Sequence, residues 1–418
     1  MLRTLFIDLN GFFASCEQQE RPELRGRAVA VAPLAAESTC CIAASAEAKR
    51  HGIKTGTRVA DARKLCPGLV VLAARPEIYI RYHNLLKAAV ESCLPLGEVA
   101  SIDELWCELP AGHAAPEPAR ALARKVKAAL RRKAGECITC SIGLAPNPWL
   151  AKIASDLEKP DGLVVIEQPE LPQRLHALAL RDLPGVGRNM ETRLRAAGIT
   201  TVAALTAATK EKLRHVWGGI EGERMWRRLR GELVPLPPTR QSTIGHSHVL
   251  PPALRNVEGA RATLHRLLQK AAMRLRDANC HAGGLHLALR LGRNRSRWSD
   301  ALTFNDTHDT RELIRVLNLL WDRRPGADTA PRFTGELSFE PPPVSARADT
   351  RPYSVGVTLF NLVPAADHIP ALPGLLDGAE RRQKLNTAID ALNQRLGKNT
   401  VVYGGALGAL DYAPLRIA

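Results

Sequence analysis

Short apolar runs that stop at acidic residues are the clearest hydrophobic and polar pattern near the start of the chain. Residues 5–7 are Leu, Phe and Ile and lead into Asp8, while residues 97–102 lead into the adjacent acids Asp103 and Glu104. Apolar runs of this length predict buried strands, and we expect these two strands to lie side by side. Neighbouring side chains on a regular strand point to opposite faces. Asp103 and Glu104 can therefore serve one site only if the chain bends there, which predicts a hairpin.

The same pattern divides residues 14–165 into helices and strands. Apolar residues at helical spacing predict helices, and uninterrupted apolar runs predict strands. The expected helices span residues 14–20, 46–50, 76–93 and 118–133, and the expected strands span residues 28–31, 40–44 and 137–144. Together these elements predict an α+β region in which a β-sheet is backed by the two long helices.

The second half of the chain changes pattern twice. Residues 166–232 predict a small helical domain, and the proline-rich residues 233–241 predict an interdomain linker. Strands are then expected near residues 243–250, 284–292, 297–304 and 333–339, with helices near 256–277 and 309–322. This β-α-β-β-α-β order predicts a ferredoxin-like split motif. In the tail, residues 353–363 predict a strand and residues 379–396 a helix.

Composition narrows the partners and the compartment. The 418 residues carry a formal net charge of +16 and a pI of about 9.8, which favours nucleic acid over an acidic membrane surface as the partner. No signal peptide or transmembrane run is visible, so we expect no membrane partner. The nine cysteines are scattered, and the single C-x-x-C from Cys137 to Cys140 lacks a second ligand pair, which disfavours a zinc site. Free thiols in a reducing cytoplasm are the preferred interpretation.

Three carboxylates at one sheet edge need a cation. Asp8, Asp103 and Glu104 would repel one another unless positive charge sits between them, although a solvated strand end is the ordinary role of a lone acid. Oxygen ligands without matching His or Cys favour Mg²⁺, with Mn²⁺ as a substitute. Two such ions about 4 Å apart would activate a 3′-hydroxyl and stabilise a leaving pyrophosphate. The acids therefore indicate phosphoryl transfer.

Two segments carry a family resemblance. Residues 8–17 (Asp-Leu-Asn-Gly-Phe-Phe-Ala-Ser-Cys-Glu) and 101–104 (Ser-Ile-Asp-Glu) resemble the two signature motifs of Y-family translesion DNA polymerases. Residues 46–49 (Ala-Glu-Ala-Lys) and the tail are similar to the UmuC branch, the catalytic subunit of bacterial DNA polymerase V. The resemblance covers nearly the whole chain. It implies error-prone, template-directed translesion synthesis by nucleotidyl transfer from a dNTP to a primer 3′-hydroxyl.

The resemblance also implies an architecture. The expected fold is an α+β multidomain right-hand polymerase with a palm, small fingers, a helical thumb and a ferredoxin-like little finger. The expected boundaries are 1–13 and 75–165 for the palm, 14–74 for the fingers, 166–232 for the thumb, 233–241 for the linker and 242–345 for the little finger. Residues 346–418 would form a C-terminal region that acts as a partner-binding tail.

Roles for the catalytic acids follow from the resemblance. Asp8 and Asp103 would bridge both metal ions, Leu9 would offer its carbonyl oxygen, and Glu104 would support the ion at the primer hydroxyl. The acids are retained, which disfavours a non-catalytic scaffold protein of the same family. The thumb and little-finger patterns disfavour a nuclease built on a similar sheet.

The nucleotide-binding residues expected from the family lie between the two motifs and just beyond them. They are Gly11, Phe12, Phe13, Cys40, Ile42, Lys49 and Lys159. Phe13 would be a steric gate against a 2′-hydroxyl, although a core Phe is the simpler alternative, and Cys40 and Ile42 would line the roof over the incoming base. Lys49 and Lys159 would reach the triphosphate; Lys49 stands where many relatives have Arg, so its grip would be weaker. Lys152 lies nearby, and a functional role and an ordinary lysine are both open interpretations for it.

DNA and protein partners are expected from the thumb onward. Gly185 and Gly187 belong to a predicted helix-hairpin-helix that would let backbone N–H groups approach a DNA phosphate. Arg293, Arg295 and Arg297 lie in a turn between two strands, and we assign them to primer-template DNA rather than to a solvated hairpin tip. Residues from Leu372 to Leu376 resemble a degenerate sliding-clamp peptide. A UmuD-like protein and a RecA filament are further partners implied by the resemblance.

Overall fold

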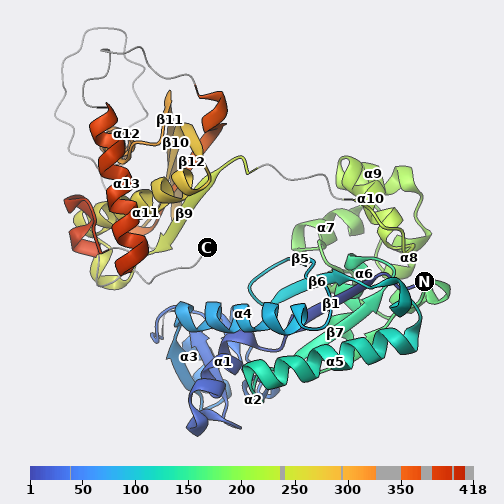
Figure 1. Cartoon of the computed structure of the whole chain (residues 1–418). Helices are drawn as coiled ribbons and strands as arrows, with labels where there is room; N and C mark the ends of the chain where they lie inside the picture. Colours follow the sequence, from blue (N-terminus) through green and yellow to red (C-terminus); the bar gives the residue numbers. More distant parts are fainter. Residues whose placement is uncertain are drawn as a thin grey trace. The chain divides into compact units, whose positions relative to one another are not determined.

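The chain forms two compact units in this computed structural model (Figure 1). The structure describes residues 1–37, 39–235, 241–292, 295–325, 350–368, 379–397 and 400–409. The first unit holds the described residues up to 235, and the second holds those from 241 onward. Among the described residues, no helix combines the length and the apolar character needed to cross a membrane.

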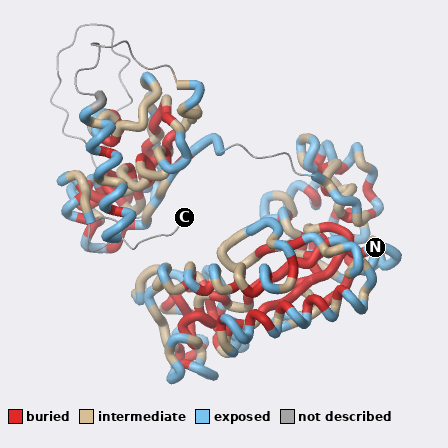
Figure 2. The backbone as a smooth tube through the Cα atoms, viewed as in Figure 1, coloured by how far each residue is buried: buried red, intermediate tan, exposed pale blue. Residues whose placement is uncertain are grey.

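A five-stranded sheet in the order β5-β6-β1-β7-β8 forms the centre of the first unit. β1 spans Thr4–Leu9, β5 Glu98–Val99, β6 Glu104–Glu108, β7 Cys140–Ala145 and β8 Leu163–Val165. β1 is central and fully buried, as the red tube in Figure 2 shows. Its Leu5 and Ile7 pack with α4 (Pro76–Glu91) and α5 (Pro116–Ala134), and its Phe6 packs on the opposite side with α6 (Pro148–Leu157). The predicted sheet backed by two long helices is confirmed.

Helix α6 lies very close to β7 at Gly143. A Cβ atom there would collide with the carbonyl oxygen of Ala151 and would come within 2.5 Å of the amide nitrogen of Ser155. Both are backbone atoms of α6, so the helix would have to move. Gly143→Ala is therefore expected to destabilise the protein by about 3 kcal/mol, which chemical denaturation would measure.

A glycine in open space provides the control for this prediction. A Cβ atom at Gly112 would meet no atom within 4 Å, so Gly112→Ala should change the free energy of unfolding by less than about 0.5 kcal/mol. Equal denaturation midpoints for Gly143→Ala and the unchanged protein would show that α6 can adjust without cost.

A smaller three-stranded sheet, in the order β3-β2-β4, follows the first strand and helix. β2 spans Val29–Ala32, β3 Ala43–Ala44 and β4 Val70–Ala73; the helices are α1 (Phe12–Glu20), α2 (Ala46–Arg50) and α3 (Val59–Leu65). This region has its own core, which includes Ala30, Cys41 and Ile53. The strand expected over residues 40–44 is shorter than predicted, because Cys40 makes only an isolated bridge to Arg58.

Four short helices complete the first unit. They are α7 (Arg188–Ala196), α8 (Val202–Ala207), α9 (Lys210–Trp217) and α10 (Ile220–Arg228). Their apolar residues share one core with Phe6 and α6, so the small helical domain packs on the sheet face that α4 and α5 leave free. Asn147 fixes the contact, since its side-chain amide donates to the carbonyl oxygens of Arg228 and Glu232, both at 3.0 Å.

The second unit contains a four-stranded antiparallel sheet in the order β11-β10-β12-β9. The elements are β9 (Ile244–Val249), α11 (Val257–Asp277), β10 (Cys280–Leu291), β11 (Ser296–Thr307), α12 (Thr310–Asp322) and β12 (Pro352–Pro364). Because β9 and β10 each pair antiparallel with β12, they run parallel with β12 between them. The predicted β-α-β-β-α-β order and split arrangement are confirmed.

The identity of the last strand corrects one boundary. The strand expected at 333–339 lies outside the described residues, whereas β12, which we placed in the tail, pairs along its length with β10 and β9. The boundary at 345 is therefore wrong, because it cuts a central strand away from its sheet. Further along the tail, the peptide from Leu372 to Leu376 lies outside the described residues.

The described end of the tail packs on the second unit. Asp390 of α13 (Ala379–Leu396) accepts two hydrogen bonds from Arg276, with Nε–Oδ2 and Nη2–Oδ1 distances of 2.5 and 2.8 Å. The 3₁₀ helix η8 (Gly404–Ala409) lies against α11, where the guanidinium of Arg266 donates to the carbonyl oxygen of Ala409 at 2.9 Å. Binding of a partner by this tail stays a prediction.

Candidate active site

Two of the predicted acids lie opposite each other on adjacent strands. Asp8 of β1 is the register partner of Glu104, and Glu104 is the first residue of β6. Asp103 lies in the turn between β5 and β6, where its carbonyl oxygen accepts the backbone N–H of Leu9 at 2.9 Å. The predicted hairpin is confirmed, but the strand ends before the acids rather than on them. Glu104 opens the second strand of the hairpin instead.

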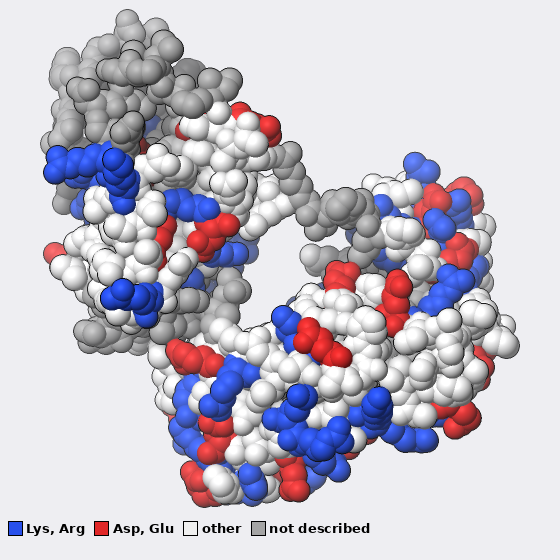
Figure 3. Space-filling view, in the orientation of Figure 1, with Lys and Arg blue, Asp and Glu red and all other residues white. Residues whose placement is uncertain are grey.

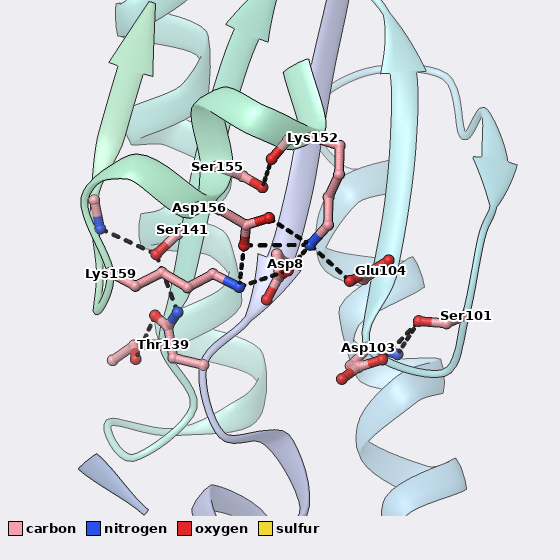
Figure 4. A network of polar contacts seen from close by, with 12 residues as sticks. Asp8, Ser101, Asp103, Glu104, Thr139, Ser141, Lys152, Ser155, Asp156 and Lys159 are labelled. Atoms are coloured by element: carbon pink, nitrogen blue, oxygen red, sulfur yellow. Dashed lines mark hydrogen bonds and ion pairs between the residues drawn. The ribbon is translucent and has the colours of Figure 1, made fainter. Parts of the chain in front are cut away.

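Two lysines occupy the space in front of Asp8 (Figure 4). The ammonium of Lys152 lies 2.5 Å from Asp8 Oδ2 and 2.8 Å from Glu104 Oε1. The ammonium of Lys159 lies 2.7 Å from the same Asp8 oxygen. Asp156 joins both lysines, at 3.3 Å from Lys152 and 2.7 Å from Lys159. The end of β1 at Asp8 therefore carries a mixed cluster of acids and lysines.

The lysines decide the charge of the buried acid. Burial alone would raise the pKa of Asp8, but the ammonium groups of Lys152 and Lys159 outweigh it and lower that pKa. Burial opposes the charge of Lys152 as well, yet Asp8 and Glu104 together raise the pKa of that lysine. Burial and the neighbouring Asp8 raise the pKa of Glu104, against the effect of Lys152. Asp8 is thus held as a carboxylate at neutral pH.

Asp103 stands apart from this cluster. Its Oδ1 accepts the hydroxyl of Ser101 at 2.6 Å, and Figure 4 shows it beside the turn and away from the lysines. Asp8, Asp103 and Glu104 do not form a group whose ligand oxygens all lie within 4.8 Å of one another; among the described residues, such a group occurs in the second unit. The sheet places the three acids at one end of the paired strands β1 and β6, and the lysines contact Asp8 and Glu104 there.

The segment that follows Asp8 is shaped by Gly11. Its φ of +57° is in the left-handed region, and an added Cβ would lie 2.8 Å from the carbonyl oxygen of Ala44 and 3.9 Å from Lys49 Nζ. The chain therefore passes close to β3 as α1 begins. The ammonium of Lys49 lies beside this turn, and burial together with the neighbouring Lys159 lowers its pKa.

The two aromatics after Gly11 have different surroundings. Phe12 is 3% exposed and its ring belongs to the main core, so its predicted contact with a nucleotide would have to come from its backbone. Phe13 is half-buried and stacks on Tyr79 with ring centroids 4.3 Å apart and an interplanar angle of 15°. The Tyr79 hydroxyl donates to Glu17 at 2.9 Å, which fixes the ring beneath Phe13.

The predicted roof residues line the edge of the small sheet. Cys40 is exposed and Ile42 is half-buried, with Cys41 buried between them. The carbonyl oxygen of Ile42 accepts the hydroxyl of Thr55 at 3.3 Å. Cys40 and Ile42 therefore project on one side of this segment and Cys41 on the other, as successive residues of an extended chain do.

Comparison with known proteins shows which protein family has this architecture. Residues 7–156 match the impB/mucB/samB family, residues 181–232 the thumb domain of DNA polymerase-iota, and residues 241–369 the C-terminal domain of the impB/mucB/samB family. The DNA polymerase IV of Moorella thermoacetica is 32% identical over 409 residues, which cover 95% of this chain and 94% of that protein. The DNA polymerase IV of Streptomyces coelicolor is 37% identical over 227 residues, or 53% of this chain and 46% of that protein. The chain belongs to the Y-family DNA polymerases.

Solved structures agree with this fold. The Y-family DNA polymerase chimera Dbh-Dpo4(243-245)-Dbh matches with a TM-score of 0.68 at 24% identity, over 87% of this chain and 100% of that one. The insertion ternary complex of Dbh DNA polymerase matches with a TM-score of 0.56. The protein is accordingly a DNA-directed DNA polymerase of the translesion class, with palm, fingers, thumb and little finger, and it depends on divalent metal ions.

The thumb loop of the polymerase borders a cleft. Residues 181–187 line a cavity of about 430 Å³ together with Lys152 and Asp156 of α6. Gly185 has a φ of +88°, and Gly187 precedes the first turn of α7, so the loop presents the start of that helix. The indole N–H of Trp149 donates to the carbonyl oxygen of Pro184 at 2.9 Å and anchors the loop to the palm.

The predicted arginine turn of the little finger is only partly described. Arg293 lies outside the described residues. The guanidinium of Arg295 lies 4.4 Å from the ring centre of Tyr353, and that of Arg255 lies 4.6 Å from the same ring. Arg297 is exposed and directly opposite Arg290 on β10. Like charges directly opposite each other on a sheet repel, so this pair favours an anionic partner.

Sequence reasoning left Lys152 open and missed Asp156 and Asn10, whereas Lys159 was among the predicted nucleotide-binding residues. Lys152, Asp156 and Lys159 are spaced i, i+4 and i+7, which places them on one face of α6 and its extension. That spacing was a readable signal for Lys152 and Asp156. Asn10 had no comparable signal. Its side chain accepts the backbone N–H of Asp161 at 2.8 Å and donates to Ser141 at 3.0 Å, which ties the turn after Lys159 to the end of β1.

Proposed function

We propose that Asp8, Asp103 and Glu104, with the carbonyl oxygen of Leu9, hold two Mg²⁺ ions at which the polymerase adds a dNTP to a primer 3′-hydroxyl. Mn²⁺ would substitute. The observation that carries the proposal is the buried Asp8 carboxylate, opposite Glu104 in register, with two ammonium groups at 2.5 and 2.7 Å. Such a carboxylate attracts cations, and the four proposed ligand groups offer only oxygen atoms, which suits Mg²⁺. When bound, the ions would activate the 3′-hydroxyl and neutralise charge on the leaving pyrophosphate.

The residues around Asp8 act on protonation and position. Asp8 stays ionised at neutral pH because the lysines lower its pKa. Lys152 and Lys159 balance its charge before substrate arrives, and Lys159 can then turn to the triphosphate without leaving Asp8 unpaired. Ser101 orients Asp103 through its hydroxyl at 2.6 Å from Oδ1. The site is thereby preorganised for a ligand that brings both metal and negative charge.

A triphosphate pocket follows from the start of α1. Helix N-termini present free backbone N–H groups, and α1 begins with Phe12 and Phe13 directly after Gly11. A Cβ atom added at Gly11 would lie 3.9 Å from the Lys49 ammonium. Gly11 is required here because its backbone is left-handed and close to Ala44. We assign phosphate contacts to these N–H groups, Lys49 and Lys159, and the roof over the base to Cys40 and Ile42.

Phe13 is proposed as the gate that rejects ribonucleotides, and this gives a prediction. Phe13→Val should raise the incorporation of rNTPs relative to dNTPs by about 100-fold, because the ring that meets a 2′-hydroxyl is removed. Single-nucleotide insertion with matched rNTP and dNTP measures the ratio. Tyr79→Phe is the control, since it keeps the ring that stacks on Phe13 and loses only the hydroxyl. A Phe13→Val protein that melts earlier but keeps its sugar selectivity would reveal a core residue only.

DNA contacts are proposed for both units. The backbone N–H groups around Gly185 and Gly187 would meet a phosphate without reading sequence. Arg293, Arg295 and Arg297 would bind the duplex backbone, which the exposed Arg290–Arg297 pair supports. Primer extension on undamaged and lesion-bearing templates tests the activity: a polymerase extends the primer, a scaffold protein leaves it unchanged, and a nuclease shortens it.

A UmuD-like protein, a RecA filament and a sliding clamp are proposed as partners. The residues Ala46 and Lys49 favour the UmuC branch, although the relatives named above are DNA polymerase IV proteins. Assays with and without a UmuD-like protein and a RecA filament would test that placement. For the sliding clamp, a pull-down that retains clamp equally well with Leu375→Ala/Leu376→Ala would remove the proposal.

A further inference from the structure

Three strand ends of the little finger bring two histidines and an aspartate together. His281 is the second residue of β10 and pairs with Val363 of β12. Asp306 lies next to the last residue of β11, and His368 follows the 3₁₀ helix η7 (Ala365–Asp367) at the end of β12. One ligand atom from each of the three residues lies within 4.8 Å of the others. Residues about 25 and 60 positions apart thus meet because β10, β11 and β12 are neighbours.

The contacts within this group are close. His368 Nδ1 and Asp306 Oδ2 lie in close contact. The rings of His281 and His368 stack with centroids 3.8 Å apart and an interplanar angle of 8°. The ring of His308 also contacts the ring of His281, with a distance of 4.2 Å between the two centroids. Three imidazoles packed this tightly would repel one another if they were protonated.

One nitrogen of the group has no hydrogen-bond partner among the residues that the structure describes. His281 is 7% exposed, and its Nδ1 is buried without a hydrogen bond. Buried polar atoms are normally hydrogen-bonded, so an unpaired imidazole nitrogen in a group of possible metal ligands is consistent with a bound ion. A neutral imidazole is the form that binds metal.

We propose that His281, Asp306 and His368 form a binding site for a divalent transition metal, for which Zn²⁺ is the representative ion. Two imidazoles and one carboxylate, with a fourth position left for water, are a ligand set that Zn²⁺ accepts. The stacked rings would fan apart about their Cβ–Cγ bonds to point at one ion. The bound metal would tie the end of β12 to β10 and β11. The bound metal would therefore stabilise the structure of the little finger.

Metal binding to the untagged, full-length protein tests the site. Equilibrium dialysis should show one more Zn²⁺ per chain for the unchanged protein than for Asp306→Asn/His368→Gln. Ions held at Asp8, Asp103 and Glu104 are common to both proteins and cancel. Bound Co²⁺ should show its visible absorption only when the cluster is intact. At 100-fold excess of Zn²⁺ over its dissociation constant, the unfolding midpoint of the little finger should rise by about 5–10 °C.

His286→Gln is the matched control, because His286 lies on the same strand and outside the group. It should keep the extra Zn²⁺ and the thermal shift. Circular dichroism of the metal-free Asp306→Asn/His368→Gln protein checks that its fold is intact. Equal Zn²⁺ stoichiometry in the unchanged and doubly substituted proteins would overturn the proposal, as would a thermal shift that the double substitution leaves in place.

Discussion

Asp103→Asn is expected to slow primer extension by about 1000-fold, because it removes one metal-binding carboxylate from the reacting centre. The substitution isolates catalysis from stability. Asp103 takes part in no ion pair among the described residues, and its contact with the Ser101 hydroxyl can be kept by the amide oxygen. We therefore expect kcat to fall while the melting temperature and the affinity for primer-template stay unchanged.

Glu108→Gln provides the matched control for this effect. Glu108 is exposed at the far end of β6, the strand that Glu104 opens. Losing its charge should leave extension within about twofold of the unchanged protein, as is usual for a surface position. Single-turnover insertion with saturating dNTP and Mg²⁺ compares the two substitutions. An Asp103→Asn protein that keeps more than a tenth of the original rate would remove Asp103 from the site.

Lys152→Ala is expected to destabilise the metal-free polymerase by about 2–3 kcal/mol, since it leaves a buried carboxylate with one cation fewer. The Asp8 side chain is 6% exposed and that of Lys152 21%, so solvent screens the pair weakly. The unfolding midpoint should fall by about 5–10 °C. Millimolar Mg²⁺ should recover most of the loss, because the ion replaces the missing positive charge beside Asp8.

The stability difference between Lys152→Ala and the unchanged protein should depend on pH in one direction. The pKa of Asp8 is lowered in the folded state from an ordinary value of 3.8. A lowered carboxyl pKa contributes stability above the unfolded-state value and loses it as pH falls through the folded-state value. The difference in the free energy of unfolding between Lys152→Ala and the unchanged protein should therefore have its full size at pH 7. It should shrink as the pH falls below 3.8.

A lysine–aspartate ion pair with a more exposed carboxylate serves as the comparison. Lys127 of α5 lies 2.8 Å from Asp161, whose side chain is 45% exposed. Lys127→Ala should cost less than about 1 kcal/mol and should not respond to Mg²⁺. If Lys152→Ala behaves in the same way, Asp8 does not need Lys152 for charge balance.

Sequence reasoning located the acids because their signal is local. Asp8 and Glu104 each sit where an apolar strand meets polar residues, and the need for a bend between Asp103 and Glu104 followed from strand geometry. The contacts of the two lysines with Asp8 were harder to predict, although Lys159 itself was among the predicted site residues. Lys152 lies on α6, 144 residues along the chain from Asp8, and Lys159 lies in the turn just after that helix. The packing of α6 on β7 at Gly143 brings this segment to the carboxylate.

The aromatics and the last strand show two further limits. Phe12 and Phe13 are adjacent and chemically alike, yet helical rotation sends one ring into the core and the other against Tyr79. In the little finger, residues 333–339 and 353–363 both have a strand-like pattern. Period alone does not say which one pairs with β10, because pairing is decided by contacts distant in sequence.

The central claim is that the acids of β1 and of the β5–β6 hairpin hold the same metal ions. Replacing Mg²⁺ by Fe²⁺ in the presence of ascorbate and peroxide cuts a polypeptide beside the bound ion, and mass spectrometry locates the cut. The account expects cleavage near residues 103–104 that excess Mg²⁺ suppresses and that Asp8→Asn abolishes, since Asp8 and Asp103 would share the ion. Cleavage there that persists in Asp8→Asn, or its absence from the unchanged protein, would contradict the account.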